Sequence, residues 1–205
     1  MNRIVISPDL CIVIKTKEKK MKKFTLIALF GLILLSSANA QTVLPENKWG
    51  IETEMVQPFI PGVGIIKFVG SYQPENIIAD KKTELLFGLY FRPNVGNHDV
   101  VEEIDEYLTL LGFRQYLWKG LHIEAMNYLG YAWGTKNKID GKDYADVAWL
   151  AEISVGYKFE VMSVGNSNLY VLPQFGFMKG IHTNIGPRKE ADEFVTGELN
   201  IGMEF

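Results

Sequence analysis

The sequence predicts an all-β fold, an eight-stranded antiparallel up-and-down β-barrel that spans a membrane. Three observations predict it. Apolar and polar residues alternate with a period of two in eight segments of about ten residues, which is the spacing of barrel strands. Large aromatic residues recur near the ends of the apolar rows. The last apolar row, which contains Leu199, Ile201 and Met203, ends on the aromatic residue Phe205.

The eight segments are separated by clusters of Gly, Pro, Asn and Asp, which are residues that favour turns. Polar Gln115 and Asn127 interrupt the apolar rows. Pro173 lies inside the seventh segment, where it has no N–H to donate to a ladder. The expected strands are 48–57, 64–72, 82–92, 105–117, 121–134, 147–159, 168–179 and 194–205.

The start of the chain has the pattern of a secretory signal peptide. Two lysines precede the apolar stretch 24–35, and the small residues Ala38 and Ala40 precede Gln41. This order predicts cleavage after Ala40. The alternative is a membrane anchor, but the 12 residues of the stretch would form a helix of only about 18 Å, against a hydrocarbon core of about 30 Å.

The chain then divides into three parts. Met21 begins a complete signal peptide, so residues 1–20 are expected to be an extension that precedes the true translation start, and 21–40 the signal peptide. Residues 41–205 form the barrel domain. The only cysteine, Cys11, lies in the extension, so the barrel domain has neither a disulfide nor a thiolate metal site.

The charge of the barrel domain argues against a nucleic-acid partner. The chain has 21 basic and 24 acidic residues, of which residues 1–40 hold 7 and 2. The remainder therefore holds 14 basic and 22 acidic residues, a net charge of −8. A nucleic-acid-binding protein needs a basic face, and this region has no run of basic residues beyond pairs.

The apolar rows could face either the core of a soluble barrel or the lipid around a membrane barrel. A soluble lipocalin-like barrel would bury them as its core, whereas a membrane barrel would turn them toward lipid. Aromatic residues near strand ends favour lipid, because aromatic girdles flank the apolar band of membrane barrels. The other face mixes Gly, Ser and charges, which suits a narrow lumen, although Leu86, Leu108 and Leu110 also fall there. The aromatic residues are Trp49, Tyr72, Phe91, Tyr107, Tyr131, Trp133, Trp149 and Phe159.

The polar rows would line the lumen with charges of both signs. Isolated buried charges are costly, so these residues are expected to form ion pairs. The interior of an eight-stranded barrel is just wide enough for side chains to fill it, which favours a plug over a gated polar pathway. The expected lumen residues are Glu52, Glu54, Lys67, Glu84, Arg92, Arg114, Glu124, Glu152, Lys158 and Glu198, with Asn200 and Glu204.

Loop length fixes which residues of the fourth and fifth segments share a face. A two-residue loop at 119–120 would turn Arg114 toward lipid whenever Glu124 faces the lumen. A three-residue loop at 118–120 sets these two residues opposite each other. It also places Gly120 where the common three-residue hairpin needs a left-handed residue and forms a bulge. The expected cross-strand neighbours are Arg114 with Glu124, Tyr116 with His122, and Leu117 with Leu121.

With the amino terminus of the barrel on the periplasmic side, four loops are outer and three turns are inner. The outer loops are 58–63, 93–104, 135–146 and 180–193, and the inner turns are 73–81, 118–120 and 160–167. Acidic residues gather in or beside two outer loops. They suit divalent cations among lipopolysaccharide phosphates, but solvated loops are favoured because cation sites need converging ligands. The acidic residues are Asp99, Glu102, Glu103, Asp105, Glu106, Asp140, Asp143 and Asp146.

The row of Leu199, Ile201, Met203 and Phe205 resembles the last strand of bacterial outer-membrane β-barrels. Eight strands in 165 residues resemble the small OmpA- and OmpX-type barrels. The resemblance implies the outer membrane of a Gram-negative bacterium, contact with its lipid and lipopolysaccharide, and reading of the aromatic-ended strand by the assembly machinery. We expect a monomer.

Signals for an enzyme are weak. One family of outer-membrane barrels that deacylate lipid A carries His-x-Ser-Asn, but His182-Thr183-Asn184 offers no serine, so no catalytic residue is carried over. His98 lies in an outer loop, and we expect neither a cofactor nor a metal. The expected role is structural, or one of surface interaction through the outer loops. The alternatives are a lipid-modifying enzyme and a narrow channel for small or apolar solutes.

Overall fold

The computed structural model describes residues 49–74, 81–96, 101–182 and 193–205. Within these parts of the chain, no helix is long and apolar enough to cross a membrane. The structure is almost wholly β, with one short 3₁₀-helix. The elements are β1 (Trp49–Glu54), η1 (Gln57–Phe59), β2 (Ile66–Tyr72), β3 (Thr83–Gly96), β4 (Glu103–Trp118), β5 (Leu121–Thr135), β6 (Tyr144–Tyr157), β7 (Phe159–Val164), β8 (Ser167–His182) and β9 (Glu193–Glu204).

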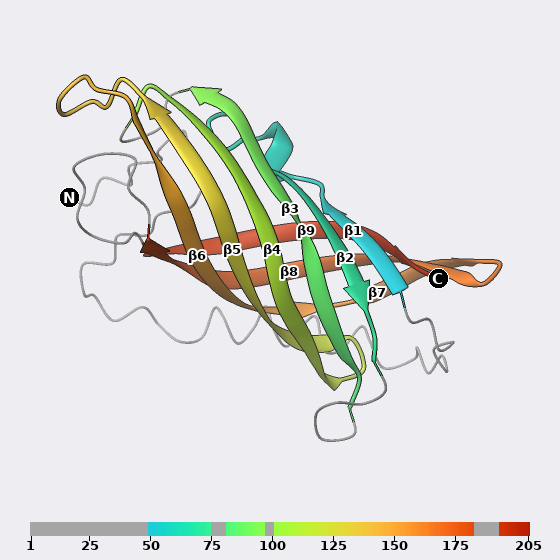
Figure 1. Ribbon diagram of the computed structural model, residues 1–205. Helices are drawn as coiled ribbons and strands as arrows, with labels where there is room; N and C mark the ends of the chain where they lie inside the picture. Colours follow the sequence, from blue (N-terminus) through green and yellow to red (C-terminus); the bar gives the residue numbers. More distant parts are fainter. Residues whose placement is uncertain (1–48, 75–80, 97–100, 183–192) are drawn as a thin grey trace, which may run out of the picture. The chain divides into compact units, whose positions relative to one another are not determined.

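Antiparallel pairing closes these strands into a barrel (Figure 1). The order around the wall is β6-β5-β4-β3-β2-β1-β9-β8, and β6 pairs with β8 to complete the ring. Strands that follow one another along the chain lie next to one another, and β1 pairs with β9 where the two ends of the barrel meet. The predicted eight-stranded antiparallel up-and-down barrel is confirmed.

The ninth strand, β7, continues β6 and adds no position to the wall. The two strands follow one register along β8, with Gly156 opposite Gln174 and Phe159 opposite Val171. The ladder pauses beside Pro173, which has no N–H to donate. The turn expected at 160–167 is therefore too long.

The β7–β8 hairpin carries the chain beyond the expected end of the sixth strand. Val164 lies opposite Ser167, and the turn contains Gly165 with a φ of 62°, a left-handed conformation that favours glycine. Figure 1 shows this hairpin projecting at the end of the barrel that holds the C-terminus. We call that end the turn end, and the opposite end, with the β5–β6 connection, the loop end.

Burial alternates along the strands, and the polar rows are the buried ones. Glu52 and Glu54 in β1 are buried, whereas Trp49 and Ile51 are about half exposed. On β4 the same contrast separates buried Arg114 from exposed Phe113 and half-buried Gln115. The apolar rows therefore face outward around the wall, and the polar rows face the interior.

Three of the interior leucines, Leu86, Leu108 and Leu110, stand among the polar rows of β3 and β4. Each is buried, and each lies opposite a glycine on the next strand. A large side chain beside a position without one lets a narrow barrel interior fill without a clash. The pairs are Leu86 with Gly112, Leu108 with Gly130, and Leu110 with Gly88.

These leucines belong to an apolar layer inside the barrel. We call this layer the interior apolar cluster; Ile65 and Phe194 pack against it as partly buried residues. On β3, β4 and β5 it lies farther from the turn end than the charged residues Glu84, Arg114 and Glu124. The cluster comprises Val69, Leu86, Tyr90, Leu108, Leu110, Met126, Tyr128, Ala132, Ala148, Leu150 and Met178.

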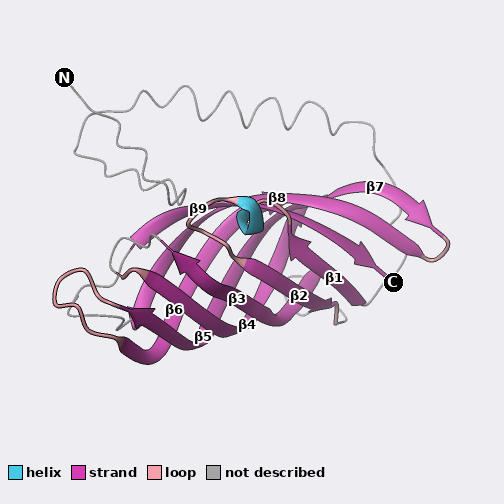
Figure 2. Cartoon of the chain, turned by 90° about the horizontal axis from the view of Figure 1, so that it is seen from above, coloured by secondary structure: helices cyan, strands magenta, loops and turns pink. Residues whose placement is uncertain are grey.

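The first strand is shorter than the expected 48–57. β1 ends at Glu54 because the carboxylate of this residue accepts the N–H groups of Val56 at 2.8 Å and Gln57 at 2.5 Å. These bonds bend the chain into η1, and the next ladder residue is Ile66 in β2. Figure 2 shows η1, in cyan, on the connection that leads from β1 to β2.

Candidate functional site

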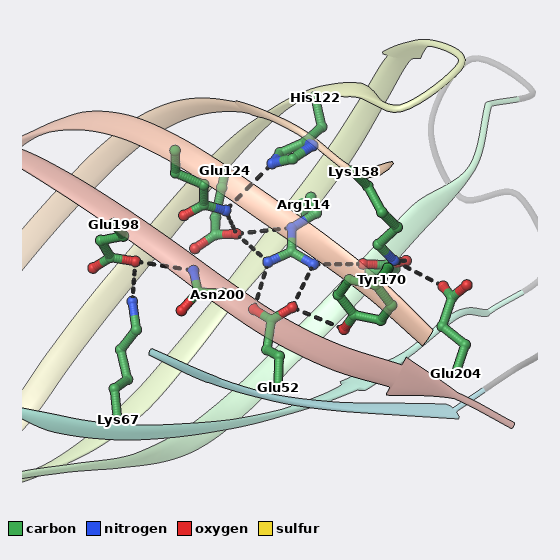
Figure 3. A network of polar contacts seen from close by, with 12 residues as sticks. Glu52, Lys67, Arg114, His122, Glu124, Lys158, Tyr170, Glu198, Asn200 and Glu204 are labelled. Carbon is green, nitrogen blue, oxygen red and sulfur yellow. Dashed lines mark hydrogen bonds and ion pairs between the residues drawn. The ribbon is translucent and has the colours of Figure 1, made fainter. Parts of the chain in front are cut away.

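The guanidinium of Arg114 is the centre of a buried ion-pair network (Figure 3). Its Nη2 lies 2.6 Å from Glu52 Oε1, and its Nη1 lies 3.0 Å from Glu84 Oε2. Its Nε donates to Glu124 Oε2 at 2.8 Å. These carboxylates come from β1, β3 and β5, so one side chain of β4 links four strands. Charge-assisted hydrogen bonds of this kind are stronger than neutral ones.

The pairing of β4 with β5 explains how Arg114 reaches Glu124. The two residues lie directly opposite each other in the ladder, as the loop-length argument predicts. Tyr116 lies opposite His122, and their ring centroids are 5.4 Å apart, which confirms the second expected pair. The register therefore places both pairs on the interior face.

The third expected pair and the expected three-residue loop at 118–120 are wrong, because β4 continues to Trp118 and the bulge lies within this strand, which leaves a two-residue loop at 119–120. Trp118, not Leu117, is opposite Leu121, and the register shifts between Tyr116 and Trp118. Lys119 takes the left-handed conformation, with a φ of 49°, in place of Gly120. Glycine is needed at 120 for a different reason.

A Cβ at residue 120 would collide with the carbonyl oxygen of Lys158. The carbonyl of Gly120 in turn accepts the N–H of Lys158 at 2.9 Å. Close backbone approach, and not a positive φ, therefore selects glycine at this turn.

A second cation sits beside the Arg114 group, nearer the turn end. Lys158 Nζ lies 2.9 Å from Glu84 Oε1 and 2.8 Å from Glu204 Oε1. Lys82 Nζ reaches Glu204 Oε1 at 2.9 Å. Glu84 thus joins the two groups into one network. We call this network the interior charged cluster; it comprises Glu52, Lys82, Glu84, Arg114, Glu124, Lys158 and Glu204.

Neutral side chains complete the hydrogen bonding of the interior charged cluster. Tyr116 Oη donates to Glu84 Oε1 at 3.0 Å, and Tyr170 Oη donates to Glu52 Oε2 at 2.9 Å. Gln174 Nε2 donates to Glu124 Oε2 at 2.9 Å. These hydroxyl and amide donors bind carboxylate oxygens that also accept from Lys158 or Arg114, so the buried carboxylates gain further hydrogen bonds, as buried charges require.

Sequence reasoning did not select Lys82 or Tyr170 as members of the network. Lys82 lies just before β3, at the edge of the expected third strand, where alternation gives no direction. Parity does place Tyr170 on the interior row of β8, but nothing in the sequence marks a tyrosine in an alternating row as a hydrogen-bond donor to a distant carboxylate. Only the closed ladder brings it to Glu52.

A smaller polar group lies next to the interior apolar cluster. Lys67 forms an ion pair with Glu198, and Asn200 Nδ2 donates to the same carboxylate at 3.3 Å. Glu152 accepts a hydroxyl bond from Tyr128 at 2.5 Å and another from Thr196. Tyr128 belongs to the interior apolar cluster, so its hydroxyl joins the polar and apolar regions.

Two expected lumen residues have other partners. Besides its two bonds near η1, Glu54 accepts the N–H of Leu199 at 3.2 Å. Arg92 lies 3.6 Å from Glu106 and donates to the carbonyl oxygens of Val63 and Gly62 at 2.9 and 2.8 Å. Both side chains therefore secure backbone at the loop end and are not part of the interior charged cluster.

The two histidines that the structure describes have different surroundings. His122 is buried, and its Nδ1 lies 3.0 Å from the carbonyl oxygen of Gly120. His182 is exposed and lies 3.4 Å from Asp146. His98, Thr183 and Asn184 lie outside the described residues.

Several of the described acidic residues of the outer loops bind a lysine side chain or backbone N–H groups. Glu102 pairs with Lys136 at 3.0 Å, and Asp105 accepts the N–H of Asn94 at 2.7 Å. In the part of the chain that the structure describes, no group of three or more His, Cys, Asp or Glu residues is arranged to hold a metal ion. Asp99 lies outside that part.

The terminal row lies on the outer face of β9, where Leu199, Met203 and Phe205 are exposed and Ile201 is half-buried. β9 pairs with β8 on one side and β1 on the other. Phe205 N donates to Trp49 O at 2.9 Å, so the last residue takes part in closing the ring. The proposed cleavage residues Ala38, Ala40 and Gln41 lie outside the described residues.

No protein-family model, curated protein or solved structure matches this chain.

Proposed function

We propose that this chain is a small barrel of a Gram-negative outer membrane, that side chains plug its interior, and that it acts through its outer loops and not by catalysis. The observation that carries the proposal is the inverted polarity of the barrel. Charged residues are buried inside it, and apolar residues cover its outside. This is the distribution that a lipid environment requires.

The outer face supports insertion in lipid. Soluble monomers rarely expose a contiguous apolar patch larger than a few hundred Å². Here exposed apolar side chains continue from strand to strand around the wall, and exposure reaches 65% at Leu111 and 63% at Ile153. Other exposed members are Ile51, Phe68, Phe87, Leu89, Leu129, Phe175 and Phe177.

Aromatic residues lie at both ends of this apolar face. At the turn end, the rings of Trp49 and Tyr72 are 4.6 Å apart between centroids. At the loop end, Tyr107 lies 5.6 Å from Trp133 and 5.9 Å from Phe91. Two aromatic belts separated by aliphatic residues support an orientation with the barrel axis across a bilayer.

The interior supports a plug. A conducting path would have to pass Arg114, which is fully buried among carboxylates from three strands, and then the interior apolar cluster. Neither layer provides a continuous row of hydrated polar groups. The plug therefore fits the contacts better than an open channel does.

The β5–β6 loop supports a surface role. Its backbone is fixed by bonds from Asn137 N to Lys142 O at 2.8 Å and from Gly141 N to Asn137 O at 2.7 Å. Ile139, in the middle of the loop, is 73% exposed. An ordered loop that presents an apolar side chain to solvent loses little conformational freedom when it binds a partner.

The proposal is tested by fractionation of cells and by current measurements on the purified barrel in planar bilayers. We expect the protein in the outer membrane and no ion conductance above the leak of the protein-free bilayer. Recovery in the soluble periplasm would contradict the location, and steady conductance would contradict the plug. Lipid A should have the same mass in cells with and without the protein; a mass difference would favour the enzyme alternative.

A further inference from the structure

One part of the barrel wall is not made of paired strands. β1 pairs with β9 only from Glu54 with Asn200 to Gly50 with Glu204. Among the described residues, no ladder joins β9 at 193–197 to β1 or β2. Residues 55–65, which include η1, connect β1 to β2, and their start lies beside β9, where Met55 N donates to Leu199 O at 2.9 Å and Gln57 Nε2 to Gly197 O at 3.4 Å. We call residues 55–65 the wall segment.

Side chains, not a ladder, satisfy much of the backbone of the wall segment. At the start of the segment, Glu54 accepts the N–H groups of Val56 and Gln57. Near the end of the segment, Arg92 donates to the carbonyl oxygens of Gly62 and Val63. Other bonds are internal, such as Phe59 N to Val56 O at 3.1 Å and Val63 N to Ile60 O at 3.0 Å. Backbone at membrane depth must be satisfied in this way, because lipid offers no partner. Met55 N still donates to Leu199 O of β9 at 2.9 Å, so it is residues 58–65 of the segment that can move without breaking a strand pairing.

The wall segment is apolar on both faces. On the outside, Met55 and Val56 are each 44% exposed and Phe59 is 81% exposed. On the inside, Ile65 packs against the interior apolar cluster. Phe194, from the stretch of β9 that pairs with β8 but not with β1 or β2, packs against the same cluster. An apolar molecule that passes here meets apolar side chains throughout.

We propose that the wall segment is a lateral gate through which a single free fatty acid enters from the membrane and lays its acyl chain on the interior apolar cluster. The inference rests on the proposed insertion in an outer membrane. The interior charged cluster lies beyond the apolar layer and offers an acyl chain no favourable surface. The chain therefore binds and does not cross the barrel.

The narrow interior selects a ligand with one chain. An eight-stranded barrel holds side chains and at most one small ligand. Displacement of Ile65 with its segment frees the volume of a few side chains, which suits one acyl chain. A phospholipid, with two chains and a large headgroup, does not fit the same opening.

The structure offers a site for locking the gate. A Cβ at residue 64 would lie 3.8 Å from Val95 Cβ, which is close to the usual Cβ–Cβ distance of a disulfide. The chain has a single cysteine, Cys11, which lies in the segment expected to be removed. In the double variant Gly64→Cys/Val95→Cys, oxidation should fix the end of the wall segment to β3, where Arg92 also holds it.

Methionine methyl groups provide the readout. Met126 and Met178 lie in the interior apolar cluster, whereas Met55, Met162 and Met203 are exposed on the outside. The protein, ¹³C-labelled at its methionine methyls, is placed in nanodiscs of perdeuterated phospholipid with protonated palmitic acid. Nuclear Overhauser effects (NOEs) then report direct contact between palmitate and each methyl group.

We expect palmitate NOEs at Met126 and Met178 in the unmodified protein and in the reduced variant. Oxidation should abolish them while those at Met203 remain. Absence of interior NOEs in the unmodified protein, with NOEs at Met203 present, would overturn the gate and leave the proposed membrane location intact. Absence at every methyl would contradict the location itself. Interior NOEs that survive oxidation would show another route and would also overturn the proposal.

Two further measurements guard against an unfolded variant and a different ligand. Gly64 has a φ of 57°, so cysteine there is strained. The variant Arg92→Gln keeps glycine at 64 and removes the side chain that holds the end of the wall segment, so it should strengthen the interior NOEs. Unchanged NOE intensities in this variant would contradict the gate. With protonated phospholipid and deuterated palmitate, Met126 should show no NOE. An NOE from phospholipid would contradict the choice of a single-chain ligand.

Discussion

The two layers of the barrel interior differ in what holds them together. In the interior charged cluster, one arginine and two lysines face four carboxylates, and each contact has a fixed donor and acceptor. In the interior apolar cluster, leucines and methionines pack without directional side-chain bonds, three leucines lie beside glycines, and the hydroxyls of Tyr90 and Tyr128 donate to Glu106 and Glu152. Both layers occupy the inward rows of the same strands.

The difference shows that the alternation of residues along a strand determines which face a side chain occupies. It does not determine whether directional ion pairs or apolar packing hold the side chains of that face together. Directional ion pairs tolerate almost no change, because removal of one partner leaves buried charge. Apolar packing tolerates exchange at similar volume. We therefore expect the charged layer to fix strand register and the apolar layer to adapt. Substitutions in the two layers, on the outer face and in an outer loop test this contrast, from the largest expected effect to the smallest.

The largest effect is expected from Arg114→Met. This change leaves Glu52, Glu84 and Glu124 facing one another without their shared cation. Breaking a buried pair in this way costs about 3–5 kcal/mol. The free energy of unfolding in urea, measured on the barrel refolded in lipid vesicles, should fall by that amount. A loss below about 1 kcal/mol would mean that water hydrates the carboxylates and that the cluster is not dry.

The double variant Arg114→Met/Glu124→Gln is the control for this substitution. Residues in one network are not additive, and coupling energies are about 0.5–3 kcal/mol. Because the second change removes a charge that the first leaves unpaired, the double variant should lose less stability than the sum of the two single changes. Additive losses would contradict the pairing of these residues.

A smaller loss is expected from Leu89→Arg on the outer face of β3. Leu89 is 47% exposed, and arginine on the lipid face costs about 2–4 kcal/mol near the bilayer midplane. The free energy of unfolding in urea, measured on the variant in lipid vesicles, should fall by this amount. The same protein in a soluble state would gain solubility and lose no stability. Serine at the neighbouring interior position, Gly88→Ser, would not be a matched control for Leu89→Arg, because a Cβ at 88 would collide with the carbonyl oxygen of Phe68.

Leu110→Met should cost less than about 1.5 kcal/mol, since the volume is nearly conserved and the Leu110 side chain has no directional bond to break. Arg114→Lys is the matched conservative change in the other layer. It keeps the charge but loses the planar fork that reaches three carboxylates, so it should cost clearly more. Equal losses for the two variants would remove the distinction between the layers.

The smallest effect is expected from Lys136→Ala. Its ammonium lies 3.0 Å from Glu102, but both side chains are more than half exposed. Water and salt screen such a pair. The midpoint of urea unfolding should not change beyond experimental error. A change as large as that of Arg114→Met would mean that burial does not decide the strength of these pairs.

Much of the fold follows from the sequence because period two, turn residues and strand length all agree. The pairing of Arg114 with Glu124 also follows, since parity and one short loop determine it. The packing of Leu86, Leu108 and Leu110 against glycines does not follow from the sequence, because the glycine partners are known only once the strands are paired. The roles of Glu54 and Arg92 are hidden for a related reason. They satisfy backbone in the wall segment, and a single-sequence pattern does not show which backbone lacks a ladder.

The most direct test of the inverted polarity uses the unmodified protein. All four tryptophans, Trp49, Trp118, Trp133 and Trp149, lie on the outer face, between 40% and 49% exposed. We expect phospholipids brominated on their acyl chains to quench most of the tryptophan fluorescence of the refolded barrel in vesicles, and aqueous iodide to quench little. Strong quenching by iodide with no effect of brominated lipid would show that the apolar face meets water, and would contradict a barrel inserted in a membrane.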